Sequence, residues 1–254
     1  MTKLLKEGFA KAKVSKRFWV CTIIIAAFSA LMVLLTKFID NSEVAAGEET
    51  TVLGVLFGLI SNQPLFMAIV PAMLVVRDFT QNTVRNKIIC GCSRTSIYLA
   101  HFVVFSVISL FYHFVSVVTT LLVGGPILGM GEIKAGCFAY SMGVSVLTIL
   151  AYAALTLFLC MLFRTVSGVI IAYVINSMLS VFAVLIMQLA GSDTVNDLIN
   201  AFILDMQSTA VMEAMADQTY PDGMMKALIP AASLCYIIIL PIIGVRLFKK
   251  ADLK

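Results

Sequence analysis

The chain has 254 residues, of which 61% are hydrophobic and only 13% are charged, and its formal net charge is +4. Soluble domains carry about 25% charged residues, so this composition excludes a water-soluble globular protein. The apolar runs are long and continuous instead of alternating at every second residue, which excludes a membrane β-barrel and predicts an all-α polytopic membrane protein.

The chain begins with a basic, amphipathic segment. On a helical wheel Leu5, Phe9 and Ala12 share one face. The opposite face carries four basic residues, namely Lys3, Lys6, Lys13 and Arg17. This pattern predicts an interfacial helix over residues 1–17 that lies in the headgroup region and binds anionic membrane lipids. A disordered basic tail that only sets the topology is the alternative.

Residues 18–248 form the predicted transmembrane domain. A spanning helix needs roughly 20 mostly apolar residues, and six segments meet this requirement. They are residues 18–38, 52–76, 97–123, 136–163, 166–190 and 227–248. Pro64 and Pro71 each remove a backbone donor and are expected to kink the second span. The run Gly124-Gly125-Pro126 is expected to end the third span.

The basic residues are concentrated on one side of the predicted membrane. Fifteen of the 18 lie before the first span, after the second or fourth span, or near the C-terminus. Only three of the 14 acidic residues share that side, namely Glu7, Asp78 and Asp252. By the positive-inside rule both termini, including the tail 249–254, are expected to lie in the cytoplasm of a multi-pass cell-membrane protein. The net charge therefore reflects topology, and we expect no nucleic-acid partner.

A polar, basic loop over residues 78–96 separates the second and third spans and is longer than a simple turn requires. Three apolar residues within it have helical spacing, namely Val84, Ile88 and Ile89. The loop is therefore expected to contain a short helix with an apolar face. Gly91 is expected to end this helix, and Ser93 to cap the next one. Such a helix would dock on a protein partner or, alternatively, lie on lipid headgroups.

Several polar side chains lie inside the predicted spans, where they are costly and mark either a pathway or contacts between helices. The candidates are His113, Asn176, Ser180 and Gln188. For His113 we favour a hydrogen bond to a neighbouring helix. The spans contain no Ser/His/acid set and no paired carboxylates, so no catalytic or cofactor site is expected. Cys90 and Cys92 form a lone Cys-x-Cys, which is a weak indication of a metal, and no metal site is expected.

The external segment 191–226 precedes the last span and is too polar to cross a membrane. Its apolar residues follow helical spacing over positions 195–210. We expect a helix that is either re-entrant or lies on the outer leaflet. Phe202 and Met206 are candidates for an external gate.

The run DFTQNTVRNKIICGCSRTSIYLA resembles the loop between spans two and three in permease subunits of type-2 ABC transporters, which have the type V exporter fold. Asn82 stands where those loops usually have glycine. The residues that match the pattern of those loops are Asp78, Thr83, Arg85, Gly91, Ser93 and Arg94. The six spans, the basic amphipathic start, the long external segment and the tail RLFKKADLK extend the resemblance to essentially the whole chain.

The resemblance implies that the loop contains a coupling helix, which docks in a cleft on a separate nucleotide-binding ATPase. The docking residues would be Asp78, Thr83, Val84, Arg85, Ile88, Ile89 and Arg94. This chain contains no G-x-x-x-x-G-K-[ST] run, so it is not expected to be an enzyme, and ATP and Mg²⁺ would bind to the partner subunit. A second permease copy, as a homodimer, or a related permease would complete the pathway.

By the same resemblance, the chain is expected to export amphipathic or hydrophobic peptides from a bacterial cell, as exporters of peptide toxins and bacteriocin-immunity permeases do. Drug or lipid efflux is the alternative within this family. An ion-coupled secondary transporter would need carboxylates inside the membrane, and the predicted spans contain none apart from Asp78 at a boundary. A membrane scaffold or sensor would need a sizeable soluble domain, for which the chain has no room.

Overall fold

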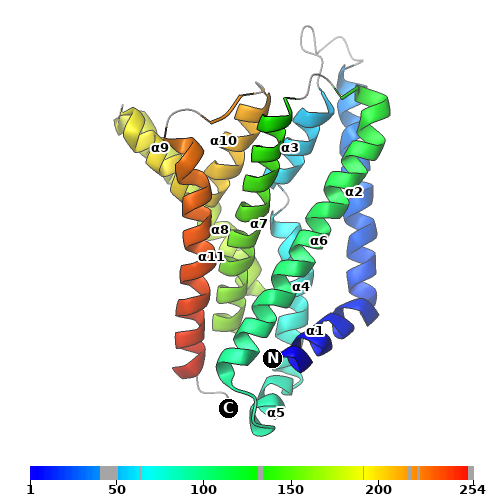
Figure 1. The fold of residues 1–254 in the computed structure, drawn as a ribbon, viewed down its shortest axis with the longest axis vertical. Coiled ribbons are helices and arrows are strands. Elements are labelled where there is room, and N and C mark those ends of the chain that lie inside the picture. Colours follow the sequence, from blue (N-terminus) through cyan, green and yellow to red (C-terminus); the bar gives the residue numbers. More distant parts are fainter. Residues whose placement is uncertain are drawn as a thin grey trace.

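The computed structural model shows a bundle of α-helices, with no strand in the parts of the chain that it describes (Figure 1). These parts are residues 1–40, 51–62, 64–130, 134–190, 192–216, 219–221 and 224–250. The helices within them are α1 (Thr2–Val14), α2 (Lys16–Asp40), α3 (Val52–Asn62), α4 (Pro64–Thr80), α5 (Thr83–Ile89), α6 (Arg94–Leu128), α7 (Ala135–Phe163), α8 (Ser167–Ala190), α9 (Asp193–Phe202), α10 (Leu204–Ala216) and α11 (Met225–Lys250).

Five of these helices are long and apolar enough to cross a membrane, namely α2, α6, α7, α8 and α11. They coincide with five of the six predicted spans. Helix α7 is the most buried of the five and packs against α4, α6, α8, α10 and α11, so it forms the centre of the bundle.

Over the second predicted span the structure describes two helices on either side of residue 63, which lies outside the described residues. They are α3, which ends at Asn62, and α4, which begins at Pro64. Proline suits the first position of a helix because its missing N–H would have no partner there in any case. Pro71 lies within α4 without ending it. The two helices follow one another along the bundle in Figure 1, but neither has the length of a span by itself.

The third predicted span continues further than expected, because α6 passes through Gly124-Gly125-Pro126 and ends at Leu128. The expected end at this run was therefore wrong. Glycine at position 124 serves packing, because a Cβ there would collide with the Val52 side chain of α3. Gly129, with φ +79°, provides the end instead.

Helix α1 lies across the end of the bundle where α5 and the last turn of α11 are also found (Figure 1). Ala12 is buried, and Leu4 and Leu5 pack against the bundle. Phe9 is 36% exposed. The bundle therefore covers much of the apolar face of α1, and contact with lipid headgroups remains a prediction.

The external segment contributes α9 and α10, and α10 packs against α3 and α7 inside the bundle (Figure 1). Leu204, Val211 and Met215 of α10 are buried. Gln207 is also buried, and its amide contacts Thr148 of α7, Ser233 of α11 and the Ala201 carbonyl. These contacts place α10 among the helices, an arrangement that favours the re-entrant interpretation.

Candidate functional site

Helix α5 is seven residues long and lies between two residues with left-handed backbone conformation. Asn82 precedes it with φ 55°, which asparagine tolerates better than most residues, so it fits where the resembling loops have glycine. Gly91 follows it with φ +85°. The Cys92 N–H donates to the Lys87 carbonyl at 3.0 Å and the Gly91 N–H to the Ile88 carbonyl at 2.9 Å, which are the two bonds of a Schellman motif. These bonds fix where α5 ends.

The apolar side of α5 is turned mostly toward the bundle. Val84 is buried in an apolar cluster formed with α4, α6, α7, α8 and α11, and Ile88 packs against the same cluster. Ile89, in contrast, is 73% exposed, and Arg85 and Asn86 are exposed as well. Val84 and Ile88 therefore hold α5 to the bundle. The exposed residues Arg85, Asn86 and Ile89 form what we call the α5 surface.

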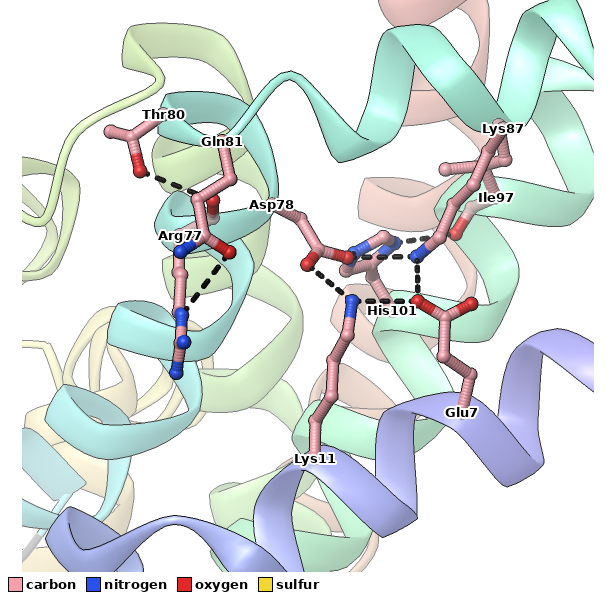
Figure 2. Close-up of polar contacts among 9 residues, drawn as sticks. All are labelled: Glu7, Lys11, Arg77, Asp78, Thr80, Gln81, Lys87, Ile97 and His101. Carbon is pink, nitrogen blue, oxygen red and sulfur yellow. Dashed lines mark hydrogen bonds and ion pairs between the residues drawn. The ribbon is translucent and has the colours of Figure 1, made fainter.

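Asp78, near the end of α4, is the centre of a charged cluster (Figure 2). Its Oδ1 accepts a hydrogen bond from Lys11 Nζ at 2.8 Å, and its Oδ2 accepts one from Lys87 Nζ at 2.8 Å. Its Oδ2 also lies 3.2 Å from Nε2 of His101. Only 5% of Asp78 is exposed, so the sequence places this carboxylate inside the protein and surrounds it with donors.

Glu7 extends the cluster, because its Oε1 lies 2.6 Å from Lys11 Nζ and 3.3 Å from Lys87 Nζ. The five residues come from four helices: Glu7 and Lys11 from α1, Asp78 from α4, Lys87 from α5 and His101 from α6. We call them the α1–α5 junction. The junction connects α1 to α5 directly through the Glu7–Lys87 ion pair and indirectly through Asp78, which pairs with both Lys11 and Lys87.

The charged groups of the junction stabilise one another's ionised forms. Burial alone would raise the pKa of the Asp78 carboxyl, but hydrogen bonds with His101, Lys11 and Lys87 hold this pKa well below its usual range. Burial likewise acts to raise the pKa of Glu7, and the two lysines lower it overall. Burial acts to lower the pKa of Lys11, and hydrogen bonds to Asp78 and Glu7 raise it above its ordinary value. Asp78, Glu7 and Lys11 therefore stay ionised at neutral pH.

Both ring nitrogens of His101 have an oxygen partner. Its Nδ1 lies 2.8 Å from the Ile97 carbonyl oxygen, and its Nε2 lies 3.2 Å from Asp78 Oδ2. These two contacts fix the orientation of the imidazole ring beside Asp78.

Arg94 lies at the start of α6, and Ser93 before it caps this helix as predicted, since its Oγ accepts from the Ser96 N–H at 3.2 Å. The Nη1 of Arg94 donates to the carbonyls of Phe248 at 3.3 Å and Lys249 at 2.8 Å. The last carbonyls of a helix lack partners within it and carry partial negative charge. Arg94 therefore connects α6 to the end of α11. Thr83, the first residue of α5, is half-buried.

The polar candidates inside the spans make contacts between helices. His113 on α6 is buried, and its Nε2 lies 3.4 Å from Ser145 Oγ on α7. Asn176 on α8 donates from Nδ2 to the Tyr152 hydroxyl of α7 at 2.7 Å. Ser180 Oγ lies 3.0 Å from the Asn176 carbonyl. The structure brings Asn176 and Ser180 together, but it leaves His113 apart from them.

Asp205 on α10 is a carboxylate that the sequence analysis did not connect with the spans. Its Oδ2 accepts a hydrogen bond from Ser180 Oγ at 3.0 Å, so α10 carries a carboxylate up to the polar side chains of α8. The analysis missed it because positions 191–226 were assigned to an external segment, and helical spacing alone does not show how deeply a segment packs.

The remaining candidates lie toward the other end of the bundle from α5. Phe202 ends α9 and is 51% exposed, and its carbonyl accepts a hydrogen bond from the Tyr236 hydroxyl at 2.9 Å. Met206 and Gln188 line one cavity, described below. In the described residues no group of three or more His, Cys, Asp or Glu side chains is arranged to hold a metal ion.

The junction is the main feature that the sequence analysis did not foresee. Asp78 was a candidate through the loop pattern, but Glu7, Lys11, Lys87 and His101 were not. One signal was present, since Glu7 and Asp78 are two of only three acidic residues on the predicted cytoplasmic side. Isolated acids in a basic region are expected to pair with neighbouring lysines, and the ion pairs drawn in Figure 2 show that they do.

A comparison with protein-family models gives a match over residues 4–186 to a family described as ABC-2 family transporter protein. The match begins in α1 and ends in α8, so it includes every residue of the junction and covers more than half of the chain. A search of curated proteins found no match.

Proposed function

The chain belongs to the ABC-2 family of transporters and is a multi-pass membrane permease subunit, and from this premise we propose that it forms the membrane part of an ATP-driven exporter. A separate ATPase subunit would dock on α5 and supply the energy, with ATP and Mg²⁺ bound to that subunit. A second copy of the permease, or a related one, would complete the pathway. The end of the bundle with α1 and α5 would then lie in the cytoplasm, with both termini.

One observation supports this proposal most directly: α5 is exposed on one side and anchored on the other. In Figure 1 it protrudes at the end of the bundle, where a partner could reach the α5 surface. Lys87, on the anchored side, contacts Asp78 of α4 and Glu7 of α1. A displacement of α5 would therefore be passed to α1 and α4 through ionic contacts, and to the bundle core through Val84.

The proposed docking contact is narrower than the loop pattern suggested. Val84 and Ile88 pack against the bundle, and Asp78 and Lys87 form an ion pair in the junction. Arg94 donates a hydrogen bond to the end of α11. The α5 surface remains for the partner. An exposed apolar residue beside a cation suits a protein partner with an apolar cleft and an acidic rim, because burial of Ile89 gives affinity and Arg85 sets the register.

The test uses Arg85→Glu in the complete transporter, with Arg246→Glu as the matched control. Arg246 is also exposed, at the same end of the bundle, but it lies on α11 and not on α5. We expect Arg85→Glu to reduce ATPase co-purification and ATP-driven transport about tenfold or more, while membrane insertion stays normal. If both variants behave like the wild type, α5 is not the docking helix.

For the substrate we propose an amphipathic or hydrophobic peptide. His113 and Asn176 form hydrogen bonds to neighbouring helices, so these polar groups of the spans already have partners. The 14 Met and 17 Phe residues supply adaptable apolar surface. Drug or lipid efflux is the alternative. Uptake into inverted vesicles of a panel of peptides, drugs and labelled lipids, compared with and without ATP, would distinguish these substrates.

Asp205 favours a second candidate, an ion-coupled transporter that works without an ATPase. Such a transporter needs a carboxylate among its membrane helices, and Asp205 reaches Ser180 of α8. Vesicles that contain the permease alone, compared with vesicles that contain the permease and the ATPase, distinguish the two candidates. Uptake driven by a proton gradient, and abolished by Asp205→Asn, would support the second candidate, whereas uptake that requires the ATPase and ATP would support the first.

A further inference from the structure

A cavity of about 660 Å³ lies between α8, α9, α10 and the segment before α11. These elements meet at the end of the bundle opposite α5 (Figure 1). Sites for small molecules have volumes of about 300–1,000 Å³, so the cavity has the size of a ligand site. It does not overlap the junction or the α5 surface.

One part of the cavity wall is apolar and adaptable. Three methionines contribute to it from three different helices, namely Met187 of α8, Met206 of α10 and Met225 of α11. Methionine side chains are flexible and polarisable, and surfaces rich in methionine accept ligands of varied shape. Val184 adds to this wall. The apolar part is therefore suited to aliphatic or aromatic groups of no fixed shape.

The other part of the wall is polar and carries one negative charge. Glu213 lines the cavity, and within the described part of the chain it makes no hydrogen bond or ion pair with another residue. Gln188 and Asn200 add side-chain amides, which can both donate and accept hydrogen bonds. Lys226 is not itself a lining residue, but its Nζ lies 3.6 Å from the centroid of the Tyr220 ring, which is part of the cavity wall.

The charge of this end of the molecule favours a cation over an anion. By the topology that the basic residues predict, 11 acidic residues and only three basic residues lie on this side of the membrane. An anion in the cavity would be repelled by this excess of negative charge and by Glu213. A purely apolar group would leave Glu213 and the Gln188 amide without polar partners once water is displaced, whereas the Asn200 amide already contacts Met225 Sδ at 3.8 Å.

We propose that this cavity binds a cationic amphipathic peptide segment, with its ammonium or guanidinium group at Glu213, its apolar side chains at the methionines and its backbone amides at Gln188 and Asn200. This inference rests on the proposed function, because it identifies the cavity as a binding site for the exported peptide on the far side of the bundle from the ATPase.

The experiment measures peptide binding to the full-length permease alone, in phosphatidylcholine nanodiscs without an ATPase. The probe is a dansyl-labelled amphipathic hexapeptide with two lysines, and its partner is the same peptide with both lysines acetylated. Fluorescence anisotropy gives the dissociation constant, with empty nanodiscs subtracted. We expect the cationic peptide to bind more tightly than the acetylated one, by about 3- to 10-fold.

Two variants and a control locate the site. Glu213→Gln should weaken binding of the cationic peptide by about 3- to 10-fold and leave the acetylated peptide unchanged. Met206→Ala should weaken both peptides by a similar factor, because it removes apolar contact without changing charge. Asp197→Asn is the matched control, since it removes a carboxylate of α9 that does not line the cavity, and it should change neither dissociation constant.

Two results would overturn the proposal. The first is equal binding of the cationic peptide by wild type and Glu213→Gln. The second is loss of peptide binding when the nanodiscs contain phosphatidylethanolamine, which would identify a lipid amine as the occupant. Because no ATPase is present, a failure of docking on α5 cannot affect these results. Peptide binding without ATP-driven transport would instead count against the proposed exporter.

Discussion

Replacement of Asp78 by asparagine is the most informative test of the junction. Asp78 accepts hydrogen bonds from Lys11 and Lys87 at 2.8 Å each and is 5% exposed. Removing one partner of a buried ion pair costs about 3–5 kcal/mol. The side chain of Lys11 is 39% exposed, so solvent screens its contribution, and Glu7 continues to pair with both lysines. We therefore expect Asp78→Asn to lower the free energy of unfolding by about 2–3 kcal/mol.

The purified permease is unfolded in mixed micelles by increasing the SDS fraction, and its helix content is measured at each step. Asp197→Asn is the control, because it removes a carboxylate far from the junction, and it should change the free energy of unfolding by less than about 0.5 kcal/mol. A double-mutant cycle with Lys87→Met then isolates the direct contact. Its coupling energy should be about 1–3 kcal/mol.

The effect of Asp78→Asn should also depend on pH. The folded state holds the pKa of Asp78 below the value in the unfolded chain. A lowered folded pKa adds stability that is fully present above the unfolded pKa and is lost as the pH falls toward the folded pKa. The difference between wild type and Asp78→Asn should therefore be constant from pH 8 to about pH 5 and shrink below about pH 4. A variant as stable as wild type at pH 7, or a coupling energy near zero, would refute this account of the junction.

Two further predictions concern α1 and the orientation of α5. A Cβ at Gly8 would lie 2.7 Å from a methyl group of Val104 on α6, and the stiff valine side chain has little freedom to move away. Gly8→Ala should therefore lower the free energy of unfolding by about 1–3 kcal/mol. Gly143→Ala is its control, because nothing lies within 4 Å of the added carbon, and equal effects of the two changes in the SDS assay would show that α1 is not packed on α6. Cys90, exposed at the end of α5, should react with a membrane-impermeant maleimide in inverted vesicles but not in intact cells, and the opposite pattern would place α5 outside the cell.

Much of the helical arrangement follows from the sequence, because hydrophobic runs determine where membrane helices lie. The long helices α2, α7, α8 and α11 begin and end close to the predicted limits. The end of α6 was predicted wrongly, since the run Gly124-Gly125-Pro126 was expected to end the third span. Glycine has two uses, a turn and a close contact, and only the position of Val52 on α3 shows which one applies here.

The site was predictable in its position but not in its contacts. The loop pattern located α5, and helical spacing identified Val84 and Ile88 as apolar positions of one helix. Spacing does not show whether such a face meets the protein's own bundle or a partner, and the structure places both residues against the bundle. Asp205 is a similar case, because its depth depends on how α10 packs against α3 and α7.

The sequence by itself determined that this is a helical membrane protein, where its long helices lie, and that a short polar helix interrupts them. These properties depend on runs of neighbouring residues and on the cost of exposing polar groups to lipid. Only the tertiary structure decided that Lys11 and Asp78, separated by 67 positions, share a hydrogen bond, and that the far end of the bundle has an open cavity with Glu213 in its wall. Such contacts depend on how helices distant in the chain pack together, and no local pattern of residues specifies that packing.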